Sequence, residues 1–278
     1  MLIRYGFHID IAVAQPTTVV TVLDVHPDRR ADILEEEGLA VEPPQHMAPF
    51  LDGGGNLCRR IDTPPGTLSL NCRGLIRDGG EPDAVVPDAR HVPVPELPNA
   101  ALVHLLGSRY CDTDLLATFA WARFGGIAGG WAKVQAVCDF VHERLTFGYE
   151  HARATRTAAQ ALEERVGVCR DFTHLAVALC RCLNIPARYC NGYLGDIGVP
   201  PVPLPMDFNA WFEAYVGDAW HTFDARHNEP RIGRIVVARG RDAADVAMIS
   251  SFGRHELRRF EVITEEVGGG APALMAAE

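Results

Sequence analysis

The sequence lacks any apolar run that approaches the roughly 20 residues needed to cross a membrane. Its N-terminus also lacks the features of a signal peptide, which are a charged start, an apolar core and a small-residue cleavage site. Arg4, His8 and Asp10 interrupt this stretch, and its pattern indicates a strand with alternating side chains. We therefore expect a cytoplasmic protein with no membrane partner.

The sequence has fewer positively charged than negatively charged side chains. The chain has 26 lysines and arginines against 36 aspartates and glutamates, a formal net charge of −10. Because nucleic-acid binding usually needs a basic face, this balance argues against a nucleic-acid partner. The hydrophobic content of 47% and the charged content of 22% are those of an ordinary soluble globular protein, and 278 residues suffice for one large or two modest domains.

Paired CxxC motifs are also missing, although the chain has eight cysteines. Without an export signal, a disulfide framework is not expected. Cys180, Cys182 and Cys190 are close in sequence, but the first two fall within a helical pattern, where residues two apart point to different sides. We expect no metal site and interpret most of these thiols as buried and free.

The N-terminal third of the chain has the pattern of a β-rich domain. Short alternating or β-branched runs, separated by turn-forming stretches, occupy residues 5–13, 17–24 and 67–76. A proline-rich segment at residues 87–98 has the composition of a linker. We predict a β-sandwich-like domain over residues 1–95 and a second domain over residues 96–278.

The second domain begins with helical signals. An apolar stripe predicts an amphipathic helix and consists of Trp131, Val134, Cys138, Val141 and Leu145. A capping-box pattern starts at Thr157. Helices are expected at residues 112–124, 131–145, 157–164 and 169–183, and strands at 187–193, 209–216 and 219–224. Helices followed by an antiparallel sheet make this domain α+β.

Cys169 lies where the last of these helices begins. Unpaired backbone N–H groups and the helix dipole favour a thiolate over a thiol at such a position. Gly167 permits close approach of the backbone to a substrate, and Arg170 adds positive charge nearby. These features are typical of a cysteine nucleophile, but position alone does not separate it from a buried structural cysteine.

Two of the predicted strands form a hairpin around Gly217 and Asp218. With Val216 opposite Ala219, the alternation of side chains places one set of residues on a common face. That set is Asn209, Trp211, Glu213, Thr222 and Asp224.

This register makes Asn209 and Asp224 diagonal neighbours, with backbones roughly 7–8 Å apart. His221 falls on the opposite face and is poorly placed to act with them. A base at position 209 could be oriented by Asp224, as in a catalytic triad. However, asparagine cannot take a proton from a thiol.

Several linked motifs carry a resemblance to a known family. They are GVC at residues 167–169, LNIPARY at 183–189, NAWFE at 209–213 and WHTFD at 220–224. Together they resemble the transglutaminase-like superfamily over residues 131–228, in particular its bacterial group of transglutaminase-like cysteine proteases. The sequence DGGGN at residues 52–56 is similar to the N-terminal β module of that group.

The resemblance implies a papain-type core and chemistry on a peptide or amide bond through a thioester at Cys169. The acyl group would then pass to water or to an amine, so the implied partners are a peptide or protein substrate and an amine acceptor. No metal or organic cofactor is implied. In the pattern of the family, Cys169 is the nucleophile, Asp224 is the third triad member, and Asn209 occupies the position of the histidine.

Asn209 leaves three interpretations open. In the first, another histidine acts as the base, and His227, shortly after Asp224, is the leading candidate. His174 lies about 140° round the helix from Cys169 and points elsewhere; an ordinary exposed histidine is the alternative for both. In the second, the chain binds a peptide or amide without turnover. In the third, Asn209 holds the substrate and the helix dipole alone activates Cys169.

Further residues are candidate substrate contacts. Tyr149 could assist an oxyanion or could simply pack, and Trp211 could wall the cleft. Glu213 could bind a polar group or an amine, or could form a salt bridge with Arg226. The backbone N–H of Cys169 is the expected oxyanion donor. The basic, glycine-bearing residues 231–242 are expected to form a loop, which could shape one rim of the cleft or, by default, be solvated.

Overall fold

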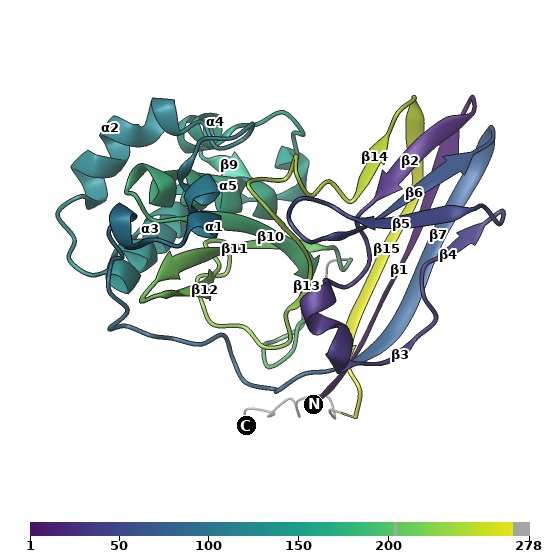
Figure 1. Ribbon diagram of the computed structural model, residues 1–278, viewed down its shortest axis with the longest axis horizontal. Helices are drawn as coiled ribbons and strands as arrows, with labels where there is room; N and C mark the ends of the chain where they lie inside the picture. Colours follow the sequence, from purple (N-terminus) through teal and green to yellow (C-terminus); the bar gives the residue numbers. More distant parts are fainter. Residues whose placement is uncertain (203–204, 269–278) are drawn as a thin grey trace, which may run out of the picture.

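The computed structural model describes residues 1–202 and 205–268. Figure 1 shows two packed parts: a sandwich of long strands, and a part in which helices cover a smaller sheet. Each part contributes a cluster of buried apolar side chains. The expected α+β class, with a β-sandwich and an α+β part, is confirmed.

The first sheet of the sandwich has five strands, in the order β15, β1, β7 and β3, with β4 also paired to β7. Its strands are β1 (Leu2–Val13), β3 (Ile33–Glu36), β4 (Ala40–Glu42), β7 (Gly66–Arg77) and β15 (His255–Glu266). The second sheet comprises β14 (Ile249–Ser251), β2 (Thr17–Thr21), β6 (Leu57–Thr63) and β5 (Met47–Leu51). Every second residue of β1 from Ile3 to Val13 is buried, which is the alternation that predicts this strand.

The last strands of the chain belong to the sandwich. β15 pairs antiparallel with β1 from Ile3, opposite Glu266, to Val13, opposite His255, and β14 pairs with β2. The predicted division at residue 95 differs from this arrangement, because residues 249–266 complete sheets of the predicted first domain. Because β1 and β15 are separated by most of the chain, no local sequence pattern predicts that the chain returns to the sandwich.

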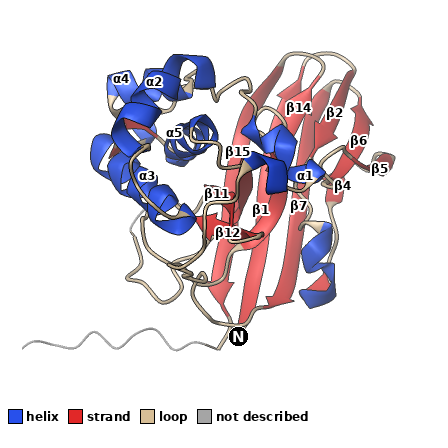
Figure 2. Ribbon diagram, turned by 60° about the vertical axis from the view of Figure 1, so that its left-hand side comes forward, coloured by secondary structure: helices blue, strands red, loops and turns tan. Residues whose placement is uncertain are grey.

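The helices of the second part gather around α5, with α2, α3 and α4 beside it (Figure 2). The helices are α1 (Asn99–Leu102), α2 (Thr113–Phe124), α3 (Gly130–Arg144), α4 (Ala158–Glu164) and α5 (Cys169–Cys182). Short 3-10 helices are η1 (Pro27–Asp32), η2 (Val94–Glu96), η3 (Val103–Leu105) and η4 (Tyr149–His151). The predicted apolar stripe on α3 is buried from Trp131 to Leu145, and the predicted capping box opens α4.

The central sheet supports α5. Its order is β12, β11, β10 and β13, and the strands are β10 (Ala187–Tyr193), β11 (Asn209–Val216), β12 (Ala219–Phe223) and β13 (Ile235–Gly240). A short parallel pair, β8 (Thr146–Phe147) with β9 (Val166–Gly167), precedes α5. The expectation of a solvated loop at residues 231–242 is wrong, because β13 lies at the edge of this sheet with Ile235 to Ala238 buried.

The hairpin has the predicted register. Val216 lies opposite Ala219, and Phe212 lies opposite Phe223. Gly217 and Asp218 both have positive φ, at 58° and 69°, as the mirror-image turn of a tight hairpin requires. The face that carries Phe212 packs against α5, and on the opposite face Trp211 packs with Cys190 of β10 and Val236 of β13.

The two parts share a core. Tyr193 of β10 packs on Tyr5 of β1, with ring centroids 5.3 Å apart, and Phe208 packs on Phe7 at 6.1 Å. The sandwich therefore fixes the strands that carry the candidate site. In residues 1–202 and 205–268, no helix is both long enough and apolar enough to cross a membrane.

Candidate active site

Cys169 is the first residue of α5, as predicted, and the N-terminus of this helix is closed by Asp171. The Asp171 carboxylate accepts hydrogen bonds from the backbone N–H of Val168 at 2.9 Å and from Nη1 of Arg156 at 3.0 Å. A Cβ atom at Gly167 would lie 2.6 Å from the Cβ of Asp171. Glycine at this position therefore permits the close approach of Asp171 that closes the helix.

The Cys169 thiol is partly exposed and predominantly protonated at neutral pH. Burial raises the pKa of the Cys169 thiol to about 11, although Arg226 and two backbone N–H groups act in the opposite direction. Asp207 adds to the rise. The helix N-terminus does not outweigh burial here, so the expectation of a favoured thiolate differs from the structure. Arg170 points away and donates to the carbonyl of Arg153 at 2.6 Å.

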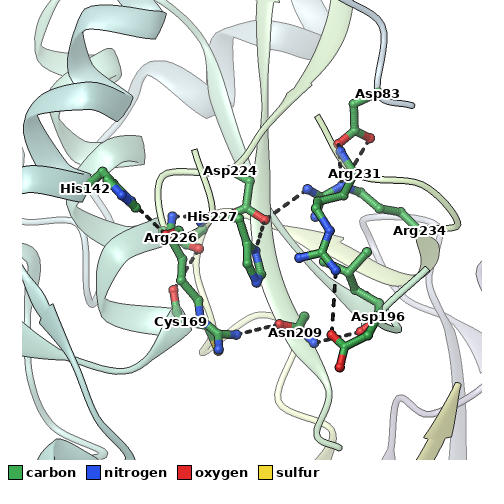
Figure 3. A network of polar contacts seen from close by, with 12 residues as sticks. Asp83, His142, Cys169, Asp196, Asn209, Asp224, Arg226, His227, Arg231 and Arg234 are labelled. Atoms are coloured by element: carbon green, nitrogen blue, oxygen red, sulfur yellow. Dashed lines mark hydrogen bonds and ion pairs between the residues drawn. The ribbon is translucent and has the colours of Figure 1, made fainter. Parts of the chain in front are cut away.

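Asn209 is bound to Arg226. Its Oδ1 accepts a hydrogen bond from Nη1 of Arg226 at 2.9 Å, and its Nδ2 donates to the carbonyls of Leu194 and Asp207, both at 3.3 Å. The Arg226 guanidinium also lies 3.9 Å from the ring centroid of Phe147. Figure 3 shows the Arg226 side chain passing Cys169 towards Asn209. Asn209 thus holds a cation beside Cys169.

Asp224 is bound to His227, the leading candidate for a substitute base. Its Oδ2 lies 2.8 Å from Nδ1 of His227 and accepts from Nη2 of Arg234 at 3.0 Å. Its Oδ1 accepts from the backbone N–H groups of Arg226 and His227, at 3.0 and 3.1 Å. Although burial acts to raise the pKa of Asp224, Arg234 and His227 hold it well below its ordinary value. The carboxylate is therefore charged and fully hydrogen-bonded.

A small pocket of about 50 Å³ lies beside Asn209, Arg226 and His227. Its lining includes Tyr149, Asp207, Asn209, Arg226 and His227. Tyr149 is 41% exposed and packs edge-on against Phe147, and burial raises the pKa of its hydroxyl. The structure therefore brings Tyr149 and His227 to one pocket with Asn209.

Trp211 and Glu213, the other predicted substrate contacts, line a different pocket. Trp211 is buried beneath the guanidinium of Arg234, 5.0 Å from its ring centroid. The Glu213 carboxylate is bound by Arg188 and Arg239, so the suggested salt bridge with Arg226 is wrong. Alternation along β11 turns both side chains to the face of the sheet on which Arg188 of β10 and Arg239 of β13 also lie.

His221 and His174 lie elsewhere, as expected. His221 packs edge-on against Trp131, with centroids 5.6 Å apart. His174 is fully buried against Tyr110 at 4.9 Å, and its Nε2 accepts from the backbone N–H of Ala243 at 3.1 Å. Neither histidine belongs to the network of Cys169 and Asp224.

Sequence reasoning missed Arg226, Arg234 and Asp83 as members of the network. Asp83 and Arg234 lie beyond Asp224 on the side away from Cys169 (Figure 3). Arginines recur at positions 226, 231 and 234, directly after Asp224, and this spacing was the available signal. Within the described residues, no group of three or more His, Cys, Asp and Glu side chains is arranged to hold a metal ion.

Comparison with known proteins places this site in a family. The family model of the transglutaminase-like superfamily matches residues 123–225, which include Cys169, Asn209 and Asp224. The uncharacterized protein ML0607 of Mycobacterium leprae is 36% identical over 89 residues, 31% of this chain. That match spans 32% of the relative, about a third of its length.

A solved structure is similar over nearly the whole chain. It is the crystal structure of a "putative cysteine protease" from Cytophaga hutchinsonii, with 31% sequence identity and a TM-score of 0.84. The match covers 98% of this chain and 92% of that one, so it includes both the sandwich and the α+β part. On this evidence, the chain belongs to the transglutaminase-like superfamily.

Proposed function

We propose that the protein is a cysteine hydrolase or transamidase that cleaves a peptide or amide bond through a thioester at Cys169, with His227 as the base and Asp224 as its orienting acid. The observation that carries this proposal is the 2.8 Å contact between Nδ1 of His227 and Oδ2 of Asp224. With Nδ1–H donated to the carboxylate, Nε2 is left as the proton acceptor. Asn209 then needs no base function of its own.

In the proposed reaction, Nε2 of His227 takes the thiol proton as the sulfur attacks the carbonyl carbon. With a thiol pKa of about 11, only about one thiol in 10⁴ is ionised at pH 7. The proton therefore leaves during the attack. The backbone N–H of Cys169 would bind the developing oxyanion, and Arg226 would favour the negative charge.

The tetrahedral adduct then collapses. The carbon–nitrogen bond breaks, His227 returns the proton to the departing amine, and a thioester remains on Cys169. His227 next takes a proton from water or from an incoming amine, which attacks the thioester and releases the sulfur. The product is an acid with water, or a new amide with an amine.

The test is turnover of fluorogenic peptidyl amides, with and without an added primary amine. Cys169→Ala should abolish turnover, and His227→Gln should lower it by about 10²–10⁴. His221→Gln is the matched control, because His221 lies on the same hairpin but faces α3, and it should retain turnover. Mass spectrometry should find the acyl group on Cys169. Turnover in His227→Gln close to that of wild type would exclude His227 as the base.

A second candidate function is binding of a peptide or amide without turnover. It is favoured by Arg226, which engages Asn209, and by the raised pKa of the Cys169 thiol. Here wild type and Cys169→Ala would bind the same peptidyl amides with equal affinity, and neither would turn them over. Asn209→His would then restore turnover, because it returns a base to the face shared with Asp224.

A further inference from the structure

Arg234 joins the proposed catalytic pair to the segment that leaves the sandwich. Its Nη2 donates to Oδ2 of Asp224 at 3.0 Å, the oxygen that also contacts His227. Its Nε donates to both carboxylate oxygens of Asp83, at 2.8 and 3.1 Å. The Arg234 side chain is 7% exposed and that of Asp224 is 3% exposed. This arginine is therefore a buried bridge between two carboxylates.

Asp83 is itself fixed in place. Its backbone N–H donates to the carbonyl of Arg231 at 2.9 Å, and its carboxylate accepts from the backbone N–H of Arg231 at 2.9 Å. Beside it, Pro82 pairs with Ile232 in an isolated bridge. The acid that holds Arg234 thus belongs to a segment pinned to the chain just before β13.

The sandwich also holds Arg234 directly. Nη1 of Arg29, in η1, donates to the carbonyl of Arg234 at 2.9 Å, and Arg29 is held in turn by Asp32 and Asp78. On the remaining side, the Arg234 guanidinium rests on the ring of Trp211. Contacts on both its backbone and its side chain leave the guanidinium a single position, facing Asp224.

From this arrangement we infer that Arg234 is a positioning residue of the active site, held by Asp83, and that it fixes the Asp224 carboxylate in the orientation in which it holds His227. The inference rests on the proposed function, because it assigns Arg234 a role in orienting the proposed base. Arg234 has no contact with the nucleophile and acts only through Asp224.

The charge of Arg234 has a second effect. A carboxylate with 3% exposure would tend to take up a proton, and the charge of Arg234 together with the contact to His227 counters this tendency. A protonated Asp224 could no longer accept from both donors. Arg234 thus keeps Asp224 as an acceptor for Nδ1–H of His227.

The experiment compares two matched variants of the full chain, Asp83→Asn and Asp24→Asn. Asp24 accepts two hydrogen bonds from Arg59, at 2.8 and 2.7 Å, and lies in the sandwich away from the site. Arg234→Lys and Arg234→Gln complete the set. Four quantities are measured: kcat, KM, the ¹⁵N signals of the His227 ring, and the pH at which the ¹³C carboxyl signal of Asp224 titrates.

If Arg234 positions Asp224, Asp83→Asn should lower kcat by about 10- to 100-fold with KM nearly unchanged, since small displacements of a catalytic group have effects of this size. The His227 ring signals should shift from the single Nδ1–H tautomer towards a mixture. Asp24→Asn should change neither. Arg234→Gln should move the Asp224 titration upward, and Arg234→Lys should restore part of it, because lysine keeps the charge but not the planar fork.

A purely structural role would give a different pattern. Asp83→Asn and Asp24→Asn would then lower the unfolding midpoint alike, with no change in the ring signals, the Asp224 titration or kcat, and the inference would be overturned. The NMR measurements need no substrate. Absence of Cys169-dependent turnover in wild type would therefore contradict the proposed function, while the His227 and Asp224 signals would still decide the role of Arg234. If Arg234→Gln does not fold, Asp83→Asn and Arg234→Lys carry the test.

Discussion

Cys169 and Asp224 lie in one polar network, yet the surroundings of Cys169 favour its uncharged form and those of Asp224 favour its charged form. Burial acts to raise the pKa of both groups. At Cys169 burial prevails, and the thiol stays protonated because Arg226 is opposed by Asp207. At Asp224, Arg234 and His227 together outweigh burial. The difference is that Asp224 accepts hydrogen bonds from a buried arginine and from His227, whereas Arg226 beside Cys169 is opposed by Asp207.

This contrast indicates where the site is preorganised. The acid, the proposed base and their supporting arginine are held by short contacts before any substrate arrives. The Cys169 thiol is left uncharged, and a pocket of about 50 Å³ is lined by Asn209, Arg226 and His227. If Cys169 is the nucleophile, as proposed, a substrate carbonyl would be needed to take the developing charge.

Removing the charge of Asp224 should have the greatest effect. Asp224→Asn leaves Arg234 with Asp83 as its remaining carboxylate partner, so stability should fall by less than the about 3–5 kcal/mol expected for an unpaired buried charge. It also removes the orienting partner of His227, so turnover should fall by about 10³–10⁴. Urea unfolding and kcat/KM measure the two effects. An Asp224→Asn variant within tenfold of wild-type turnover would contradict the assigned role of the pair.

Removing Arg226, the cation beside Cys169, should increase the difference between the pKa shifts of Cys169 and Asp224. Arg226→Gln should raise the pKa of the thiol above about 11. A thiol whose pKa is higher by about one has a thiolate fraction about tenfold lower at a given pH. The rate of Cys169 alkylation by iodoacetamide between pH 7 and 10 measures this fraction.

Arg170→Gln is the matched control for that measurement. Arg170 is adjacent to Cys169 in sequence, but its guanidinium donates to the Arg153 carbonyl. The control should alkylate at nearly the wild-type rate. Equal rates in Arg226→Gln and wild type would show that Arg226 does not act on the thiol.

Burial affects the pKa of both Cys169 and Asp224, and at His174 the effect of burial can be measured. Burial holds the pKa of His174 well below its ordinary value, and Arg170 and Arg181 act in the same direction. The unfolded chain therefore binds a proton at this residue below about pH 6.5, whereas the folded chain does not. Stability should consequently fall as the pH drops below 6.5, by about 1.4 kcal/mol per pH unit for this group.

Urea unfolding at pH 7.5 and 5.5 measures that loss. His104, whose pKa burial lowers to about 4, adds to the same slope. Asp224 does not contribute in this range, because its share of the stability is lost only below about pH 4. The slope should become shallower in His174→Gln. An unchanged slope would show that burial at His174 is not the cause.

The local architecture of the site was predictable, because it depends on patterns within short segments. Alternation along residues 209–224 and the Gly217-Asp218 turn fix the hairpin register, and the apolar spacing of α5 places Cys169 at its start. These features need no information from distant residues. The placement of Asn209 near Asp224 followed from the same reasoning.

The polar partners could not be predicted in the same way. Arg226 could reach Glu213 or Asn209 from its position in sequence, and only the turn after β12 directs it to Asn209. Asp83 meets Arg234 because the connecting segment crosses the end of β13. The thiol pKa depends on burial by tertiary contacts, which a helix-start motif does not reveal.

The pairing of β15 with β1 has a consequence for the pocket beside Asn209. One edge of β1 finds its partner only in residues 255–266, far along the sequence. The backbone N–H of Thr264 contacts the sulfur of Met206 at 3.2 Å, and Met206 lines the pocket beside Asn209. The lining of the pocket is therefore supported by a strand distant in sequence from Asn209. A change that loosens β15 from β1 should reach the pocket through Met206 without altering any residue of the network around Asp224.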